Sequence, residues 1–167
     1  NGGDYYGRQE PVAGLTAALR VVSLHANHWH WAEQAVGRAW AEAGRDPLAA
    51  YDNRYRIEVL LEAAAAERAA LSDANHFLYL VKANQTFVPG GAATAAEGLR
   101  RITAPALILH APTDQVFASE WVLATAEAIR ANGVAVETAE IAGPFGHLNG
   151  VLAPGAEAGR IAAFLAR

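Results

Sequence analysis

Apolar positions in the first half of the chain recur at the spacing of a helical face. Leu15 and Leu19 are separated by one helical turn, and Val36 and Trp40 repeat the same interval. Side chains three and four positions apart lie on one side of an α-helix. The pattern shows almost no alternation of β-branched residues. We therefore expect a helical block over residues 11–87.

Breaks divide this block. Pro11 can open its first helix, because the N–H that proline lacks would be unpaired there. Residues 44–47, Gly-Arg-Asp-Pro, interrupt the pattern, and Pro47 is suited to begin another helix. Residues 57–71 are rich in Ala, Leu and Glu, which favours a helix, and Ser72-Asp73 supplies an N-cap for the next one. A turn-rich Val-Pro-Gly-Gly segment then ends the block.

The pattern changes after this linker. Residues 106–110, Ala-Leu-Ile-Leu-His, form a short continuous apolar run, typical of a parallel strand that is covered on both faces. Residues 118–131 predict a helix that ends near Gly133, residues 134–141 alternate as a strand does, and residues 154–165 predict an amphipathic closing helix. This βαβα order predicts an α/β fold with the edge of a parallel sheet.

Composition narrows the classes of function. The chain has 167 residues, about one domain, and a net charge of −4 without any long basic run, so we expect no nucleic-acid partner. It has no cysteine, which excludes disulfides, thiolate metal ligands and a thiol nucleophile, and is compatible with a cytoplasmic location. No apolar run approaches the roughly 18–20 residues that cross a bilayer, so we expect no membrane partner.

Two residues of the C-terminal part are candidates for chemistry. Asp114 follows the first predicted strand, at the sheet edge where open α/β sheets place their sites. His147 lies in a glycine-flanked loop after the second strand. This is the chain order of the acid and base in a Ser–Asp–His triad, where the acid orients the imidazole and the imidazole moves the proton. The alternatives are a turn-capping aspartate and a surface-loop histidine.

Other polar residues have weaker claims. His110 lies within an apolar strand, which favours a packed, hydrogen-bonded histidine. A histidine cluster invites a metal site, but no metalloprotease pattern accompanies it, so we expect no metal there and favour aromatic lining of a pocket or a helix interface. The residues of this cluster are His25, His28 and His30 with Trp29 and Trp31. The serines of the chain are Ser23, Ser72 and Ser119, and none of them lies in a Gly-x-Ser-x-Gly elbow. The nucleophile is therefore expected upstream of Asn1, and Asn1-Gly2-Gly3 looks like an interior point of a longer protein.

Four stretches of the chain together resemble one family. They are residues 3–6 with 14–20, residues 73–80, residues 102–114 with Phe117, and Gly146-His147. In this order and spacing they are similar to the C-terminal half of a homoserine O-acetyltransferase-type α/β-hydrolase. The first two stretches resemble the family's Gly-Asp-Tyr loop and the Asp-Ala-Asn helix of its cap. The last two resemble the strand that leads to the triad acid, and the triad base.

The resemblance implies a fold, a reaction and partners. It implies a loop over residues 1–10, a helical cap over residues 11–95, and the C-terminal part of an α/β-hydrolase core over residues 96–167, with Asp114 and His147 as acid and base. The implied reaction moves an acyl group from a small-molecule thioester or ester, through serine, to an alcohol or water. No cofactor is implied, with acyl-CoA a candidate co-substrate. The implied partners are the serine-bearing N-terminal half and a second copy, joined through cap helices.

Two positions depart from the family pattern. The family has an aspartate directly after the catalytic histidine, placed for the amino group of homoserine, and this chain has Leu148. Lys82 stands where the family commonly has arginine. Both are candidate substrate-binding positions. Both departures argue against homoserine as the acceptor and favour an esterase or transfer to a less polar alcohol. The alternative reading is a non-catalytic helical-plus-α/β interaction module or an inactive fragment.

Overall fold

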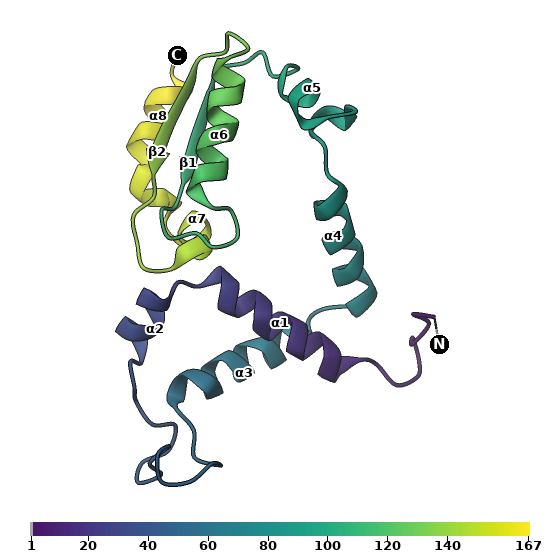
Figure 1. Cartoon of the computed structure of the whole chain (residues 1–167), viewed down its shortest axis with the longest axis vertical. Coiled ribbons are helices and arrows are strands. Elements are labelled where there is room, and N and C mark those ends of the chain that lie inside the picture. Colours follow the sequence, from purple (N-terminus) through teal and green to yellow (C-terminus); the bar gives the residue numbers. More distant parts are fainter. Residues whose placement is uncertain (1) are drawn as a thin grey trace. The chain divides into compact units, whose positions relative to one another are not determined.

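The structure, a computed structural model, describes residues 2–167 and consists of two compact units. A helical unit comprises residues up to 25 and residues 32–86, and an α/β unit comprises residues 26–31 and 87–167. Figure 1 shows the elements of both. In chain order they are α1 (Val12–Ala26), α2 (Trp29–Ala35), α3 (Arg56–Ala70), α4 (Ala74–Thr86), η1 (Pro89–Gly91), α5 (Ala95–Leu99), β1 (Ala106–His110), α6 (Ser119–Arg130), β2 (Val136–Glu140), η2 (Gly146–Leu148), α7 (Asn149–Leu152), η3 (Pro154–Glu157) and α8 (Ala158–Leu165).

The core of the helical unit lies between α1 and α3. Leu15 and Leu19 of α1 pack against the methyl groups of Ala65 and Ala69, and Phe77 of α4 packs against this cluster. Leu19 is 1% exposed. The predicted helices opening after Pro11 and spanning residues 57–71 are therefore confirmed, and so is the apolar face formed by Leu15 and Leu19.

A polar network fixes the N-terminal loop to the start of α4. The Tyr5 hydroxyl donates to the Asp73 carboxylate and accepts from the backbone N–H of Asn75. Asp73 also accepts from the His76 N–H at 2.7 Å, so of the predicted Ser72-Asp73 pair it is Asp73 that caps α4. Burial raises the pKa of the Tyr5 phenol, and the hydrogen bond from Tyr5 lowers the pKa of Asp73.

The prediction of a helix through Val36 and Trp40 is wrong. The N–H groups of Val36 and Gly37 both donate to the Ala32 carbonyl, and Gly37 adopts a φ of 52°. A residue with left-handed backbone angles cannot continue a right-handed helix. Glycine adopts these angles readily, because it has no Cβ to clash with the backbone. Trp40 instead forms an antiparallel bridge with Tyr55.

The helix expected to begin at Pro47 is also absent. The Asp46 carboxylate accepts from the Leu48 N–H at 2.9 Å, and the Asn53 amide donates to the Asp46 carbonyl at 2.8 Å. An aspartate that binds the backbone two residues later stabilises a turn and competes with the helix. The segment between α2 and α3 is consequently irregular.

The α/β unit is built on two parallel strands. Ala106 of β1 pairs with Val136 of β2, and the register continues to His110 and Glu140. Helix α6 packs against both strands, with Ala126 and Ile129 buried (Figure 1). The predicted parallel pairing, the intervening helix and the α/β class are confirmed, with strand and helix ends displaced by one or two residues.

Two further elements complete this unit. Gly133 adopts a φ of 83° just after α6, as expected for a helix that stops there. The closing segment begins at Pro154 with a 3₁₀ turn before α8, and Arg167 beyond α8 pairs with Glu137 of β2.

None of the helices formed by residues 2–167 is both apolar and long enough to cross a membrane. The predicted cap, residues 11–95, is defined by its function. The division of the structure into two compact units does not test that function, so the cap stays a prediction.

We predict that truncating Leu19 destabilises the protein. Leu19→Ala removes buried methyl groups from the contact between α1 and α3, so the free energy of unfolding should fall by about 2–5 kcal/mol in a urea titration. Leu24→Ala is the matched control, because Leu24 lies on the same helix and is 58% exposed. Its effect should stay within about 0.5 kcal/mol. Equal losses for the two variants would contradict the assigned core.

Candidate active site

Asp114 lies in the turn that follows β1. Its N–H donates to the Ala111 carbonyl at 3.0 Å, which turns the chain at the end of the strand. One carboxylate oxygen, Oδ1, accepts from the N–H groups of Val116 and Phe117 at 2.7 and 2.8 Å. The turn-capping role that the sequence offered as an alternative is therefore present, and it uses one oxygen.

The second oxygen of Asp114 reaches the predicted base. Oδ2 lies 2.9 Å from Nδ1 of His147, which stands in η2. The carboxylate side chain is 10% exposed and the imidazole side chain is 30% exposed. The Phe117 ring meets the imidazole at an interplanar angle of 63° with centroids 5.3 Å apart. The structure thus brings together the two residues that the sequence singled out.

This contact fixes what the imidazole can do. An ionised carboxylate offers only acceptors, so the proton of the hydrogen bond lies on Nδ1 of His147. Nε2 then carries the lone pair and can take a proton from a donor in front of it. If Nε2 is protonated, the ring becomes an imidazolium beside the Asp114 carboxylate, which stabilises the positive charge.

The pair lines a cavity of about 280 Å³ in the α/β unit. Strand ends, α6 and α7 supply its walls, so the two polar groups face mainly apolar surroundings. The lining residues are Leu109, His110, Ala111, Asp114, Phe117, Val122, Ile141, His147, Gly150 and Val151. An apolar cavity with a few convergent polar groups is the usual form of a small-molecule site.

Gly146 allows the imidazole loop to approach its neighbours. It adopts a φ of 60°, and a Cβ at this position would lie 2.9 Å from the His28 nitrogen and 3.2 Å from the Thr113 oxygen. Those atoms are backbone and cannot rotate away. The glycine before His147 is therefore required by a close approach of three backbone segments, of which residues 26–31 form one.

Comparisons with known proteins identify relatives of the chain. No protein-family model matches the chain. The chain is 31% identical over 157 residues to a homoserine O-acetyltransferase of Haloferax volcanii, covering 88% of this chain and 38% of that protein. It is 28% identical over 156 residues to a homoserine O-acetyltransferase of Symbiobacterium thermophilum, covering 87% of this chain and 38% of that protein. The chain is a homologue of the homoserine O-acetyltransferases. It spans well under half the length of these relatives.

Solved structures show the same fold. The crystal structure of esterase E22 matches with a TM-score of 0.81 and 29% identity, over 93% of this chain and 43% of that one. The crystal structure of homoserine O-acetyltransferase from Bacillus anthracis matches with a TM-score of 0.79 and 22% identity, over 97% of this chain and 43% of that one. This homoserine O-acetyltransferase homologue therefore has the fold of part of an α/β-hydrolase.

One buried residue next to this site was not predicted from the sequence. Asn149 of the homologue lies two positions after His147 and is 0% exposed. Its amide oxygen accepts from the Phe145 N–H at 3.2 Å, and its amide nitrogen donates to the Gly143 carbonyl at 3.0 Å. The signal in the sequence is an asparagine within a loop that, apart from His147, is made of glycines and apolar residues.

His110 and Ser119 form a second histidine–serine contact. Nδ1 of His110 lies 2.8 Å from the Ser119 hydroxyl oxygen, and the hydroxyl donates its proton to the Ala111 carbonyl at 3.1 Å. His110 is 8% exposed, as expected for the packed, hydrogen-bonded histidine that the sequence favoured. Ser119 begins α6 rather than a nucleophile elbow, so this contact holds the helix to the end of β1.

The histidine cluster near the α1–α2 junction shows no metal geometry within residues 2–167. The His30 N–H donates to Nδ1 of His28 at 3.3 Å, and the two rings are 4.4 Å apart. Burial, and then the charge of His30, lower the pKa of His28. Trp29 is 59% exposed, so its ring stands at the surface in the described structure.

The two candidate substrate-binding residues lie in different units. Leu148 belongs to the α/β unit, directly after His147 in η2, and is half-buried. The residues that line the Asp114–His147 cavity do not include it. Lys82 belongs to α4 in the helical unit, where it is exposed and its carbonyl accepts from the Thr86 hydroxyl. The substrate-binding roles of both residues stay predictions.

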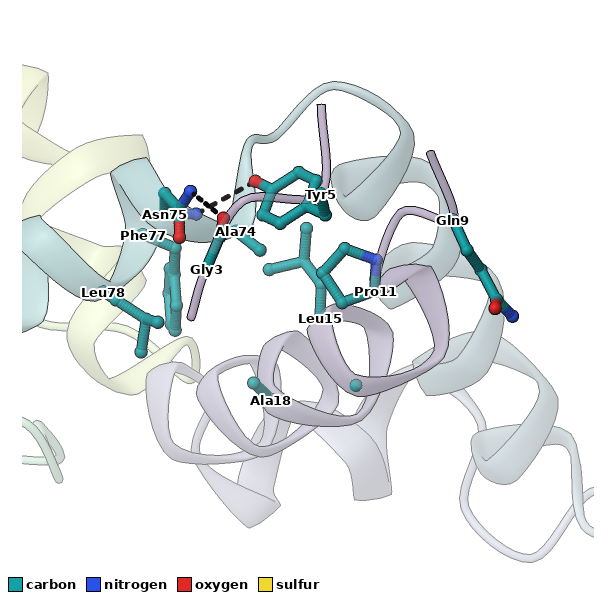
Figure 2. Close-up of a pocket in the computed structure, with 11 residues that line it drawn as sticks. Gly3, Tyr5, Gln9, Pro11, Leu15, Ala18, Ala74, Asn75, Phe77 and Leu78 are labelled. Atoms are coloured by element: carbon teal, nitrogen blue, oxygen red, sulfur yellow. Dashed lines mark hydrogen bonds between the residues drawn. The ribbon is translucent and has the colours of Figure 1, made fainter. Parts of the chain in front are cut away.

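A separate pocket of about 350 Å³ lies within the helical unit. Figure 2 shows Tyr5, Pro11 and Leu15 on one side of it and Asn75, Phe77 and Leu78 on another. Asn75 donates through its backbone to Tyr5 and through its side chain to Gly3 (Figure 2). These polar groups are satisfied by one another, so the pocket presents mainly apolar surface and none of the predicted acid–base residues.

We predict that Gly146→Ala disrupts the imidazole loop. The added Cβ meets backbone atoms on two sides and the positive φ is unfavourable for alanine, so the free energy of unfolding should fall by about 1–3 kcal/mol. Gly159→Ala in α8 is the matched control, because its Cβ would meet nothing within 4 Å. That variant should be neutral or slightly stabilising in the same titration. Equal stability of Gly146→Ala and wild type would refute the close approach.

Proposed function

We propose that this chain supplies the acid and base of a Ser–Asp–His enzyme that transfers acyl groups or hydrolyses carboxylic esters. The observation that carries the proposal is the 2.9 Å contact between Asp114 Oδ2 and His147 Nδ1 at the wall of an apolar cavity. The relatives named homoserine O-acetyltransferase and the structural neighbour named esterase support the same class of chemistry.

The proposed reaction follows from the protonation state of the pair. Nε2 of His147 accepts the proton of a serine hydroxyl as the serine oxygen attacks the acyl carbonyl carbon. The imidazolium then returns this proton to the leaving alcohol or thiol, and an acyl-serine ester remains. In the second half, His147 takes a proton from water or an acceptor alcohol as its oxygen attacks the acyl carbon. The imidazolium then returns this proton to the serine oxygen as the acyl–serine bond breaks, which regenerates the free serine. Asp114 holds the Nδ1 proton throughout and keeps its own charge.

The serine is proposed to come from a segment outside this chain. The hydroxyl of Ser72 donates to the Arg68 carbonyl, and that of Ser119 contacts His110, so each has another role. Strand β1 pairs with β2, and within residues 2–167 no other strand joins the sheet. Parallel sheets are normally buried and contain more than two strands. We propose that strands of the nucleophile-bearing segment pair with the free edge of β1.

The choice between hydrolysis and transfer is proposed to depend on Leu148. An apolar side chain beside the base cannot pair with the ammonium group of an amino-alcohol acceptor, and an unpaired buried charge costs several kcal/mol. Leu148 therefore favours water or a less polar alcohol as acceptor. The acyl donor is proposed to be a small ester or thioester, with acyl-CoA included, and no bound cofactor is needed for these steps.

The helical unit is proposed to act as a cap and as the contact between two copies of the enzyme. Helix α4 presents Leu78, Tyr79 and Leu80 with exposed fractions of 62%, 78% and 55%. An exposed apolar surface of this kind is typical of an interaction site. The competing function is a non-catalytic helical-plus-α/β interaction module or an inactive fragment, and it is favoured because no serine of this chain lies in a Gly-x-Ser-x-Gly elbow.

We predict that removing either member of the pair abolishes turnover. Asp114→Asn should lower kcat by about 10⁴-fold, because the amide can no longer fix the Nδ1-protonated tautomer, and His147→Ala should lower it at least as much. The measurement is hydrolysis of p-nitrophenyl acetate by the enzyme together with every polypeptide that co-purifies with this chain. His25→Ala and Asp52→Asn are matched controls, because both residues are exposed.

Two results would contradict this assignment. Unchanged turnover in His147→Ala would remove the proposed base. Labelling by a fluorophosphonate at Ser23, Ser72 or Ser119, located by mass spectrometry, would contradict a serine supplied from outside this chain.

We predict that charge at position 148 changes the acceptor. Leu148→Asp introduces a carboxylate that can pair with an ammonium group, so the ratio of O-acetylhomoserine to free acetate should rise by about tenfold or more when homoserine is present. Leu148→Asn introduces a side chain of the same shape as aspartate but without the charge, so it should leave the ratio near the wild-type value. A ratio unchanged by the aspartate would show that position 148 does not select the acceptor.

A further inference from the structure

Asn149 is the fully buried polar side chain nearest to the proposed base. A buried amide is costly unless its oxygen and nitrogen are both hydrogen-bonded. Here Oδ1 accepts from the Phe145 N–H at 3.2 Å, and Nδ2 donates to the Gly143 carbonyl at 3.0 Å. One side chain therefore bonds two backbone groups of the loop that carries His147, on the N-terminal side of the imidazole.

The same side chain also reaches the loop of the acid. Nδ2 of Asn149 lies 3.5 Å from the Thr113 hydroxyl, and this hydroxyl lies 3.5 Å from the Gly143 carbonyl. Thr113 directly precedes Asp114. Asn149, Thr113 and Gly143 thus form a polar triangle between the loop after β1 and the loop after β2, beside the contact of the two catalytic groups.

Gly143 leaves the space that this arrangement requires. A Cβ on Gly143 would lie 2.4 Å from the Asn149 amide oxygen and 3.0 Å from its Cγ. Any other residue at this position would displace the amide. The loop is therefore built around the asparagine side chain, although Asn149 touches neither the cavity nor, in the proposed mechanism, the substrate.

We infer that Asn149, with Thr113, is a positioning residue that sets His147 against Asp114. The inference rests on the proposed function, because it assigns a role within that acid–base pair. Without the amide, the N–H of Phe145 loses this acceptor and the carbonyl of Gly143 keeps only the 3.5 Å contact with the Thr113 hydroxyl, so the loop can shift relative to the turn that holds Asp114. A displacement of about 1 Å at a catalytic group can cost about 10²-fold in rate.

The test compares Asn149→Ala and Thr113→Val with wild type in the enzyme as it is purified with its co-purifying polypeptides. Both variants should lower kcat for p-nitrophenyl acetate by about 10- to 100-fold and leave KM within about twofold, since the cavity walls are unchanged. Thr113→Ser keeps the hydroxyl and should retain the wild-type kcat. Arg130→Met is the control for simple destabilisation, because it removes the 3.0 Å bond from Nε to the Val136 carbonyl at the start of β2. It should lower thermal stability without lowering kcat.

A spectroscopic measurement separates positioning from folding. In wild type the ¹⁵N shifts of the neutral His147 imidazole should show the Nδ1-protonated tautomer, and in Asn149→Ala they should move toward an average of the two tautomers. If Asn149→Ala fails to fold, the same shifts are measured in Thr113→Val.

The outcomes are distinguishable. Wild-type kcat and an unchanged tautomer in both variants, with His147→Ala inactive, would overturn the positioning role and leave the proposed function intact. Full activity of His147→Ala would overturn the proposed function itself. A fall in kcat for Arg130→Met as large as that for Asn149→Ala would assign the effect to stability and also overturn the inference.

Discussion

The candidate site in the α/β unit depends on one contact between two loops, the carboxylate–imidazole pair of Asp114 and His147. The carboxylate has two oxygens and uses them differently, since Oδ1 holds the turn through backbone N–H groups and Oδ2 holds the imidazole. The turn therefore fixes the direction in which Oδ2 points. Because one carboxylate makes both sets of bonds, the turn after β1 and the orientation of the His147 ring are fixed together.

Much of the α/β unit could be predicted because its signals are local. The apolar run of β1, the helix α6 and the turn at Gly133 each depend on residues adjacent in the chain, and the parallel order follows from the length of the connection between the strands. The meeting of Asp114 and His147 follows in turn, because carboxyl ends of neighbouring parallel strands lie at one edge of the sheet.

The features that could not be predicted depend on contacts that leave no repeating pattern in the sequence. The amide of Asn149 bonds backbone groups four and six residues earlier, and such pairing of a side chain with a loop leaves no repeat in the sequence. The helix expected at Trp40 failed for a related reason. One glycine conformation at Gly37 and an antiparallel bridge with Tyr55 outweighed a helical spacing that was correct for Leu15 and Leu19.

The close approach at Gly146 has a consequence for protein engineering. Asp114, His147 and the loops that hold them all belong to the α/β unit, and so does the short peptide of residues 26–31, which joins the end of α1 to the start of α2. A chimera that exchanged the helices for those of a relative would need to retain this peptide, because its backbone meets the glycine before the imidazole. The natural graft points are therefore within α1 and α2, not at their junction.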